Sequence, residues 1–296
     1  MFSTKLFAQT SENNIYLSNV VYEPSEKTIF YKLGGSTIPI NVLQYGNATH
    51  FVCINLHANE ITSVQAARSV LEETGGTLIK IENKQQRVIR FRLKGINYGF
   101  DPNRIFSRVG IEQTLKENSR VSPDAVEEVE KFAQRILSLI PENTSCIVAL
   151  HNNTEEAYSV RSYLPGSDRE TDAKAVYADS LQDVDDIVFT TDSLLYWKMA
   201  EMGYNSIWQD NENAKRDGSL SIYCGERNRR YINVETQHGK LGQYVEMLHK
   251  LLSIIRQGNK KSPGLPEDSS DPAGTRTQDP NIKSVVLYQL SYKISK

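Results

Sequence analysis

The chain has 296 residues, of which 39% are hydrophobic, so it is long enough to bury a sizeable core. It carries 34 basic and 36 acidic residues, and the formal net charge of -2 gives no electrostatic reason to expect nucleic acid or an anionic membrane as a partner. No run approaches the roughly 18 to 20 apolar residues that cross a bilayer, and the cysteines, Cys53, Cys146 and Cys224, form no C-x-x-C pair and are interpreted as core residues.

The two ends of the chain differ from its middle. Residues 1–27 are predicted to be an N-terminal extension, in which Leu6 to Gln9 resembles the end of a truncated signal peptide. Export to the periplasm or the exterior is expected if the start is truncated, and a cytoplasmic location otherwise. Residues 28–257 are predicted to form one domain. Residues 258–296, rich in Pro, Gly, Ser and charge, are predicted to be a disordered or spurious tail.

The first half of the domain alternates short apolar runs with helical periodicity. In chain order, the pattern predicts a hairpin over 28–43, a strand over 50–58, a helix over 60–73, strands over 77–81 and 87–93, a helix over 123–140 and a strand over 145–150. Gly75-Gly76 ends the first helix, and Ser122 is a suitable N-cap for the second.

The second half repeats the strand-then-helix unit. It predicts a strand over 186–191, a helix over 192–203, strands over 219–224 and 231–235, and a closing helix over 241–256. Strands that alternate with helices indicate an α/β fold in which a sheet is covered on both faces.

Polar residues stand where two of these strands end. His57 and Glu60 form H-A-N-E after the strand over 50–58, and His151 follows the strand over 145–150. The crevice beyond the carboxyl ends of strands is where open α/β sheets bind ligands. Two imidazoles and one carboxylate leave an open position on zinc, the arrangement of catalytic sites. These three residues are therefore candidate ligands of one Zn²⁺ ion.

Further motifs accompany this pair in the same order as in a known family. They are Asp101-Pro102-Asn103-Arg104-Ile105-Phe106, then His151, and then Val234-Glu235 with Gly239. Over about residues 48–240 the sequence resembles the zinc carboxypeptidase superfamily, and most closely its succinylglutamate desuccinylase and aspartoacylase branch. The resemblance implies a three-layer sandwich with a central mixed, mostly parallel sheet flanked by helices.

The resemblance also implies roles for individual residues. Asn103 and Arg104 would bind the substrate carboxylate, for which a guanidinium fork is well suited, and Asn152 could add a polar contact. Glu235 would be the general base. An arginine upstream of Asn103 would stabilise the oxyanion. The candidates are Arg87, Arg90 and Arg92; Arg92 is the choice, since Arg90 and Arg92 share a face of the predicted strand and Arg87 does not.

The expected activity is hydrolysis of an amide bond in a carboxylate-bearing substrate, a small peptide or an N-acyl amino acid. A carboxypeptidase or murein-peptide amidase is favoured for an exported protein, and an N-acyl amino acid deacylase for a cytoplasmic one. A third interpretation is a protein that has the same fold and binds the metal but does not turn over a substrate. A serine hydrolase is disfavoured because the sequence has no G-x-S-x-G elbow. The sequence does not reveal the oligomeric state.

Overall fold

The computed structural model describes residues 21–47, 50–154 and 158–258. These residues belong to the first of two units into which the chain divides, Met1–Lys260. The predicted signal-peptide remnant and almost all of the predicted tail lie outside the described residues. The first strand starts at Pro24, four residues before the predicted domain boundary.

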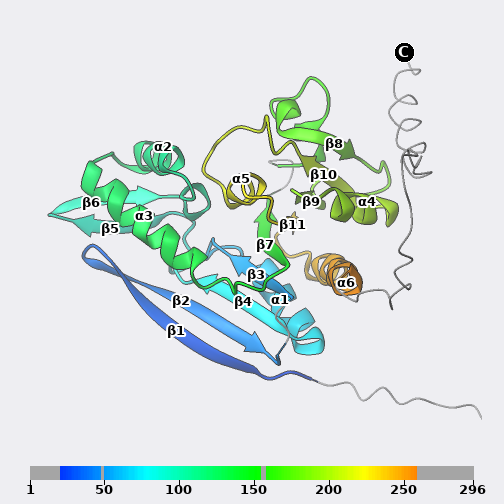
Figure 1. Ribbon diagram of the computed structural model, residues 1–296, viewed down its shortest axis with the longest axis horizontal. Helices are drawn as coiled ribbons and strands as arrows, with labels where there is room; N and C mark the ends of the chain where they lie inside the picture. The colour runs from blue at the N-terminus through cyan, green and yellow to red at the C-terminus, as the bar shows by residue number, and fades with distance from the viewer. Residues whose placement is uncertain (1–20, 48–49, 155–157, 259–296) are drawn as a thin grey trace, which may run out of the picture. The chain divides into compact units, whose positions relative to one another are not determined.

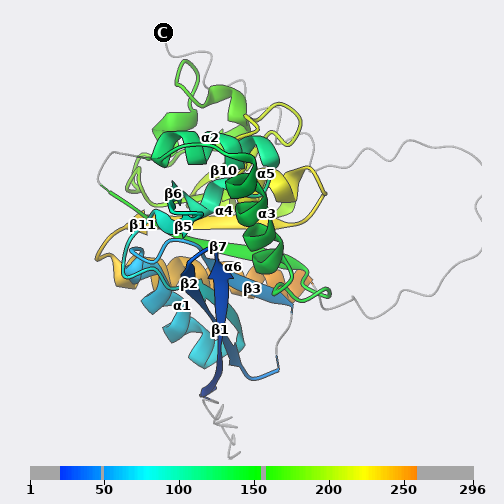
Figure 2. The same cartoon turned by 90° about the vertical axis from the view of Figure 1, so that its left-hand side faces the viewer.

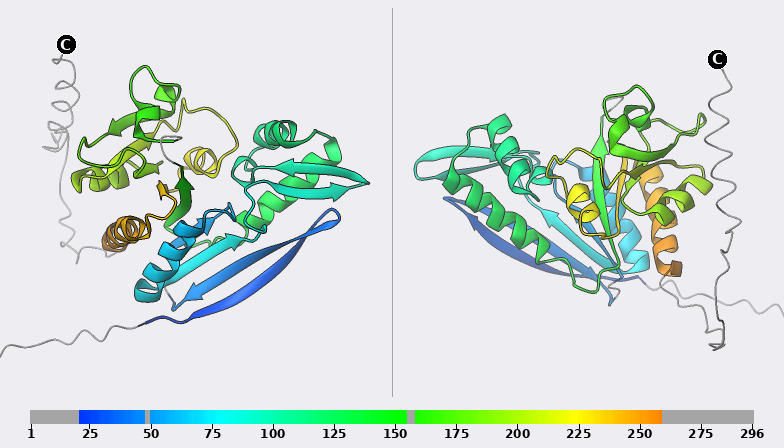
Figure 3. Two further views of the ribbon diagram at one scale, coloured as in Figure 1. Left: turned by 180° about the vertical axis from the view of Figure 1, so that it is seen from behind. Right: turned by 45° about the horizontal axis from the view of Figure 1, so that its top comes forward.

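A nine-stranded sheet forms the centre of the fold, in the order β1-β2-β4-β3-β7-β11-β9-β10-β8. Its strands are β1 (Pro24–Leu33), β2 (Ser36–Tyr45), β3 (Phe51–Asn55), β4 (Gly76–Ile81), β7 (Cys146–Asn153), β8 (Ala173–Tyr177), β9 (Ile187–Thr190), β10 (Asn205–Gln209) and β11 (Tyr231–Gln237). The central strands β4, β3, β7 and β11 run parallel, whereas β1, β2 and β8 add antiparallel pairs at the edges. Figure 3 shows β1 and β2 as long paired strands at one edge. The predicted α/β class with a mixed sheet is confirmed.

Helices cover both faces of this sheet. They are α1 (Ile61–Thr74), α2 (Arg108–Asn118), α3 (Pro123–Leu137), α4 (Ser193–Glu201), α5 (Leu220–Gly225) and α6 (Leu241–Gly258). Apolar residues of α1, α4 and α6 share one buried cluster, and those of α2, α3 and α5 share another. Figures 1 and 2 show α1 and α6 on the opposite side of β3 and β7 from α3 and α5. The fold therefore has three layers.

The strand β3 shows why the central strands read as continuous apolar runs. All five of its residues are buried, with Phe51 and Cys53 in the α1 cluster and Val52 and Ile54 in the α3 cluster. A strand that is buried on both faces has no polar side to alternate with its apolar one. Within the described residues, no helix is long and apolar enough to span a membrane.

One predicted strand is wrong. Residues 219–224 form the helix α5, which begins after Ser219, whose hydroxyl accepts a hydrogen bond from the backbone N–H of Ile222. A short apolar run does not distinguish a strand from a buried helical turn. The pattern also missed α2, β8, β10 and β6 (Ile96–Phe100), which pairs with β5 (Ile89–Leu93) in a separate hairpin.

Candidate functional site

The three candidate ligands converge on one point. His57 Nδ1 lies 2.9 Å from Glu60 Oε1, and His151 Nδ1 lies 3.1 Å from Glu60 Oε2. The two imidazole Nδ1 atoms are 3.3 Å apart, and all three side chains are buried. The strands explain this convergence, because β3 pairs in parallel with β7 and so brings the turn after β3 beside His151.

The protonation of the cluster follows from this crowding. Burial alone would raise the pKa of Glu60, but the neighbouring His151 and His57 lower it to about 2. Burial alone would lower the pKa of His57, but Glu60 and Asp101 raise it to about 8. The carboxylate is thus ionised and its electrostatic field draws positive charge into the cluster.

The donor set fits a zinc ion. Two imidazole nitrogens and a carboxylate oxygen lie within 4.8 Å of one another, and zinc takes these ligands in catalytic sites. The other ring nitrogen of His57, Nε2, lies 2.7 Å from Asp101 Oδ1. A carboxylate behind a histidine ligand fixes the tautomer and orientation of the ring, as metal sites require. Asp101 itself is held by His57 and Arg87, which keep its pKa well below the usual range despite its burial.

Glu235 lies next to this cluster on the adjacent strand. It is in register with His151 in the parallel pair β11 and β7, and it lines the same pocket. Its side chain is only 8% exposed, and Asn233 Nδ2 donates a hydrogen bond to its Oε2. Burial, with the nearby negative charge of Glu60, raises the pKa of Glu235 to about 8. A carboxyl group with this pKa can both accept and release a proton near neutral pH.

The arginine beside the cluster is Arg87, so the choice of Arg92 is corrected. Arg87 donates to Asp101 Oδ2 at 3.0 Å and to Glu60 Oε1 at 3.3 Å, and it lines the pocket. Arg92 is exposed on β5, and its carbonyl accepts a hydrogen bond from Gly35 at the β1–β2 turn. The reason is that Ile89 and Phe91 form the buried face of β5, which leaves Arg92 on the exposed face. Arg87 lies just before β5 and contacts Asp101, which follows β6.

Asn103 and Arg104 both line the pocket, as their predicted role in binding requires. The Arg104 guanidinium forms an ion pair with Asp217 at 3.5 Å, and the Asn103 side-chain oxygen accepts a hydrogen bond from the Leu220 backbone. Gly110 and Gly218 pack closely against each other and against the backbone of Arg104. A Cβ on Gly110 would lie 2.7 Å from the Arg104 carbonyl oxygen and 2.5 Å from the backbone of Gly218, so neither neighbour could move aside cheaply.

Asn152 also lines the pocket, but its amide is already used inside the protein. Its side-chain oxygen accepts from Ser63 N at 3.0 Å, and its nitrogen donates to Thr236 O at 3.3 Å. These bonds tie α1 and β11 to β7. The contact with substrate expected of Asn152 therefore stays a prediction, and the structure gives this residue a structural role.

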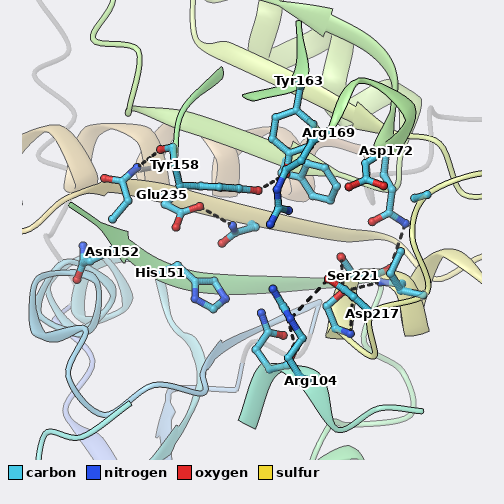
Figure 4. Close-up of a pocket in the computed structure, with 18 of the residues that line it drawn as sticks. Arg104, His151, Asn152, Tyr158, Tyr163, Arg169, Asp172, Asp217, Ser221 and Glu235 are labelled. Carbon is cyan, nitrogen blue, oxygen red and sulfur yellow. Dashed lines mark hydrogen bonds and ion pairs between the residues drawn. The ribbon is translucent and has the colours of Figure 1, made fainter. Parts of the chain in front are cut away.

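The pocket is a cavity of about 420 Å³, and its far wall includes residues that follow β7 in the chain. Figure 4 shows Tyr158, Tyr163 and Arg169 on that wall, facing Arg104 and Asp217. The Arg169 guanidinium lies 5.2 Å from the centre of the Tyr158 ring and 6.0 Å from that of Tyr163. No motif marks Arg169, because its position depends on how the segment after β7 folds back over the sheet.

Comparisons with known proteins were made at the levels of sequence and structure. No protein-family model matches the chain, and no curated protein sequence matches it. A solved aspartoacylase family protein from Mesorhizobium loti is 15% identical, with a TM-score of 0.43, 79% of this chain covered and 67% of that one. For murein-tripeptide amidase from Escherichia coli O157 the identity is 12%, the TM-score 0.42 and the coverage 79% and 93%.

A tripeptide-bound cell shape determinant protein from Helicobacter pylori is 12% identical, with a TM-score of 0.43 and 71% of this chain covered. The chain spans about half of that protein, since 51% of it is covered.

Proposed function

We propose that the chain is a zinc-dependent hydrolase that cleaves an amide bond in a carboxylate-bearing substrate, of the carboxypeptidase or murein-peptide amidase type. One observation carries this proposal: the buried side chains of His57, Glu60 and His151 lie within bonding reach of a single ion. Glu235 lies beside His151, and Arg104 lines the same pocket. A deacylase of N-acyl amino acids would use the same residues in the same roles, so the two versions differ in substrate and not in mechanism.

His57, Glu60 and His151 would hold the ion. Bound zinc would polarise the scissile carbonyl and lower the pKa of water to about 7. Asp101 would keep the His57 ring in the orientation that the metal site needs, because it already contacts Nε2 at 2.7 Å.

Glu235 would take a proton from the attacking water and pass it to the leaving amine. Its pKa of about 8 suits both steps at neutral pH. Arg87 would donate N–H groups to the negative charge that develops on the carbonyl oxygen. Arg104, with Asn103 beside it, would hold the substrate carboxylate, so that the amide lies at the metal-binding end of the pocket.

Metal analysis and a substrate screen test this proposal. Purified protein should contain one zinc ion per chain, and it should hydrolyse a member of a panel of dipeptides, muropeptides and N-acyl amino acids until the metal is chelated. Glu235→Gln should keep the zinc and lose hydrolysis, because the amide has the same shape and cannot accept the proton. Full activity after thorough chelation, or unchanged turnover in Glu235→Gln, would overturn the mechanism.

A further inference from the structure

The strand β1 forms a long edge of the nine-stranded sheet. It pairs with β2 on one side, and no described strand pairs with its other side. It has 10 residues, whereas β8 at the opposite edge has 5. Figures 1 and 3 show β1 as the outermost strand on its side of the sheet. Unpaired N–H and C=O groups along a strand of this length can bind another extended strand.

The turn after β1 determines which of its backbone groups point outward. Leu33 and Ser36 flank a two-residue turn and are partners in the β1–β2 register, which runs without a break back to Pro24. Residues that flank such a turn exchange hydrogen bonds with each other, and hydrogen-bonded positions then alternate along an antiparallel pair. Every second residue, counted back from the one before Leu33, therefore directs its N–H and C=O groups away from β2. These outward residues are Lys32, Phe30, Thr28 and Glu26, and the next one, Pro24, has no N–H.

The side chains of the outward residues are exposed and include charges of both signs. Strand alternation places them on one face of β1. The ring of Phe30 is among them and is 69% exposed. Within the described part of the chain, neither Glu26 nor Lys32 forms an ion pair. The edge thus combines free backbone groups, an exposed ring and two unpaired opposite charges.

We propose that β1 is a docking edge for β1 of a second copy of this chain. Two copies would form a symmetric dimer in which the strands pair in antiparallel orientation around Ile29. In this register Glu26 lies opposite Lys32 of the second copy, and Thr28 lies opposite its Phe30. Each of these pairs exchanges two backbone hydrogen bonds, and the twofold axis repeats every contact. The two sheets would continue into each other.

The charges of β1 favour this register and this partner. Moving the strands past each other by two residues would place Lys32 opposite Thr28 or Pro24 of the second copy and leave Glu26 without an opposite charge. Lysines on an edge strand usually discourage pairing with other chains. An acid at the matching position removes this penalty only for a strand with the same arrangement of charges. A second copy meets this condition by symmetry.

The docking edge lies away from the candidate metal site. Strands β2, β4 and β3 separate β1 from β7, which carries His151. The partner would therefore contact the edge of the sheet and not the metal ligands. Dimerisation and the proposed hydrolysis can be measured independently, so either proposal can fail while the other stands.

Sedimentation velocity of the full chain over a range of protein concentrations tests the inference. The wild type should show a reversible equilibrium between monomer and dimer. Lys32→Glu places an acid opposite Glu26 at both ends of the strand pair, and Glu26→Lys places a base opposite Lys32. Each substitution should raise the dissociation constant of the dimer by about 10- to 100-fold, because each repulsive contact occurs twice.

An equimolar mixture of the two variants should form dimers again. In the mixed dimer the native Glu26 faces the native Lys32, and the two introduced charges face each other with opposite signs. This recovery needs folded chains, so it separates a lost contact from a lost fold. Lys27→Glu is the matched control, because it makes the same charge change at an exposed residue on the other face of β1. It should leave the dissociation constant nearly unchanged.

Three results would overturn the inference. A wild type that stays monomeric at every concentration would mean that this edge is free or is covered by another segment of the same chain. An unchanged dissociation constant in Lys32→Glu would mean that the copies meet elsewhere. Failure of the mixed variants to associate would mean that Glu26 and Lys32 do not lie opposite each other.

Discussion

Replacing Arg87 with Gln tests which arginine stabilises the oxyanion in the proposed reaction. The substitution removes two charge-assisted hydrogen bonds, to Asp101 and Glu60, and any N–H group that faces the developing oxyanion. We expect kcat to fall by about 10²- to 10³-fold, which is the usual effect of removing one hydrogen-bond donor from an oxyanion hole. The free energy of unfolding should change far less than the activation free energy. Arg87 is 47% exposed, so its ion pairs contribute no more than about 1 kcal/mol to the free energy of unfolding.

Arg92→Gln is the matched control for this experiment. Arg92 carries the same charge on the exposed face of the β5–β6 hairpin, and a surface substitution of this kind usually changes free energies by less than about 0.5 kcal/mol. The assay is kcat and KM for any substrate found in the screen, with urea unfolding of both variants. Near-normal kcat in Arg87→Gln, or an equal loss in Arg92→Gln, would refute the assignment of Arg87.

Three further substitutions address the metal site and the stability of the fold. Asp101→Asn should weaken zinc binding about 10- to 100-fold in competition with a chelating dye, since the carboxylate behind His57 is lost; unchanged affinity would contradict this role. Tyr244→Phe should lower the free energy of unfolding by about 1 to 3 kcal/mol, because the Tyr244 hydroxyl accepts from His151 N and donates to Val234 O inside the protein. Asp186→Asn should stabilise the protein at pH 7. Burial raises the pKa of Asp186 to about 6, above its unfolded value of 3.8, so the folded wild type loses stability as the pH rises from about 4 through 6. The advantage of the variant, up to about 3 kcal/mol, should vanish in unfolding experiments at pH 4, and a constant advantage would show that the carboxyl group does not titrate in this way.

The three candidate zinc ligands were predictable because the spacing of His57 and Glu60 is tied to local structure. His57 and Glu60 are three residues apart in the turn between β3 and α1, and His151 lies in the next parallel strand. Because β3 and β7 are parallel neighbours, the turn after β3 lies beside the carboxyl end of β7, where His151 is found. Most buried strands and long amphipathic helices could be predicted for the same reason, since their periodicity is local.

The positions of Arg87 and Arg169 around the pocket could not be predicted from the sequence. Choosing between Arg87 and Arg92 required knowing that Ile89 and Phe91 form the buried face of β5, which leaves Arg92 exposed. Arg169 was missed because its position depends on tertiary contacts with Tyr158 and Tyr163, and a segment without helical or strand periodicity gives no sign of them. Residues that line binding sites often lie in such connections.

The carboxylates around the two histidines favour the binding of a cation at the site. Glu60, Asp101 and Glu235 lie around the imidazoles, and Arg87 is the permanent positive charge that contacts the first two of them. Glu60 and Asp101 raise the pKa of His57 to about 8, and burial, with the negative charge of Glu60, raises the pKa of Glu235 to about 8. A divalent ion would replace the proton on His57, so zinc affinity should increase as the pH rises toward about 8 and level off above it. Affinity measured by chelator competition across this range tests the argument, because a flat profile would mean that His57 is already neutral and that the carboxylates do not hold its proton.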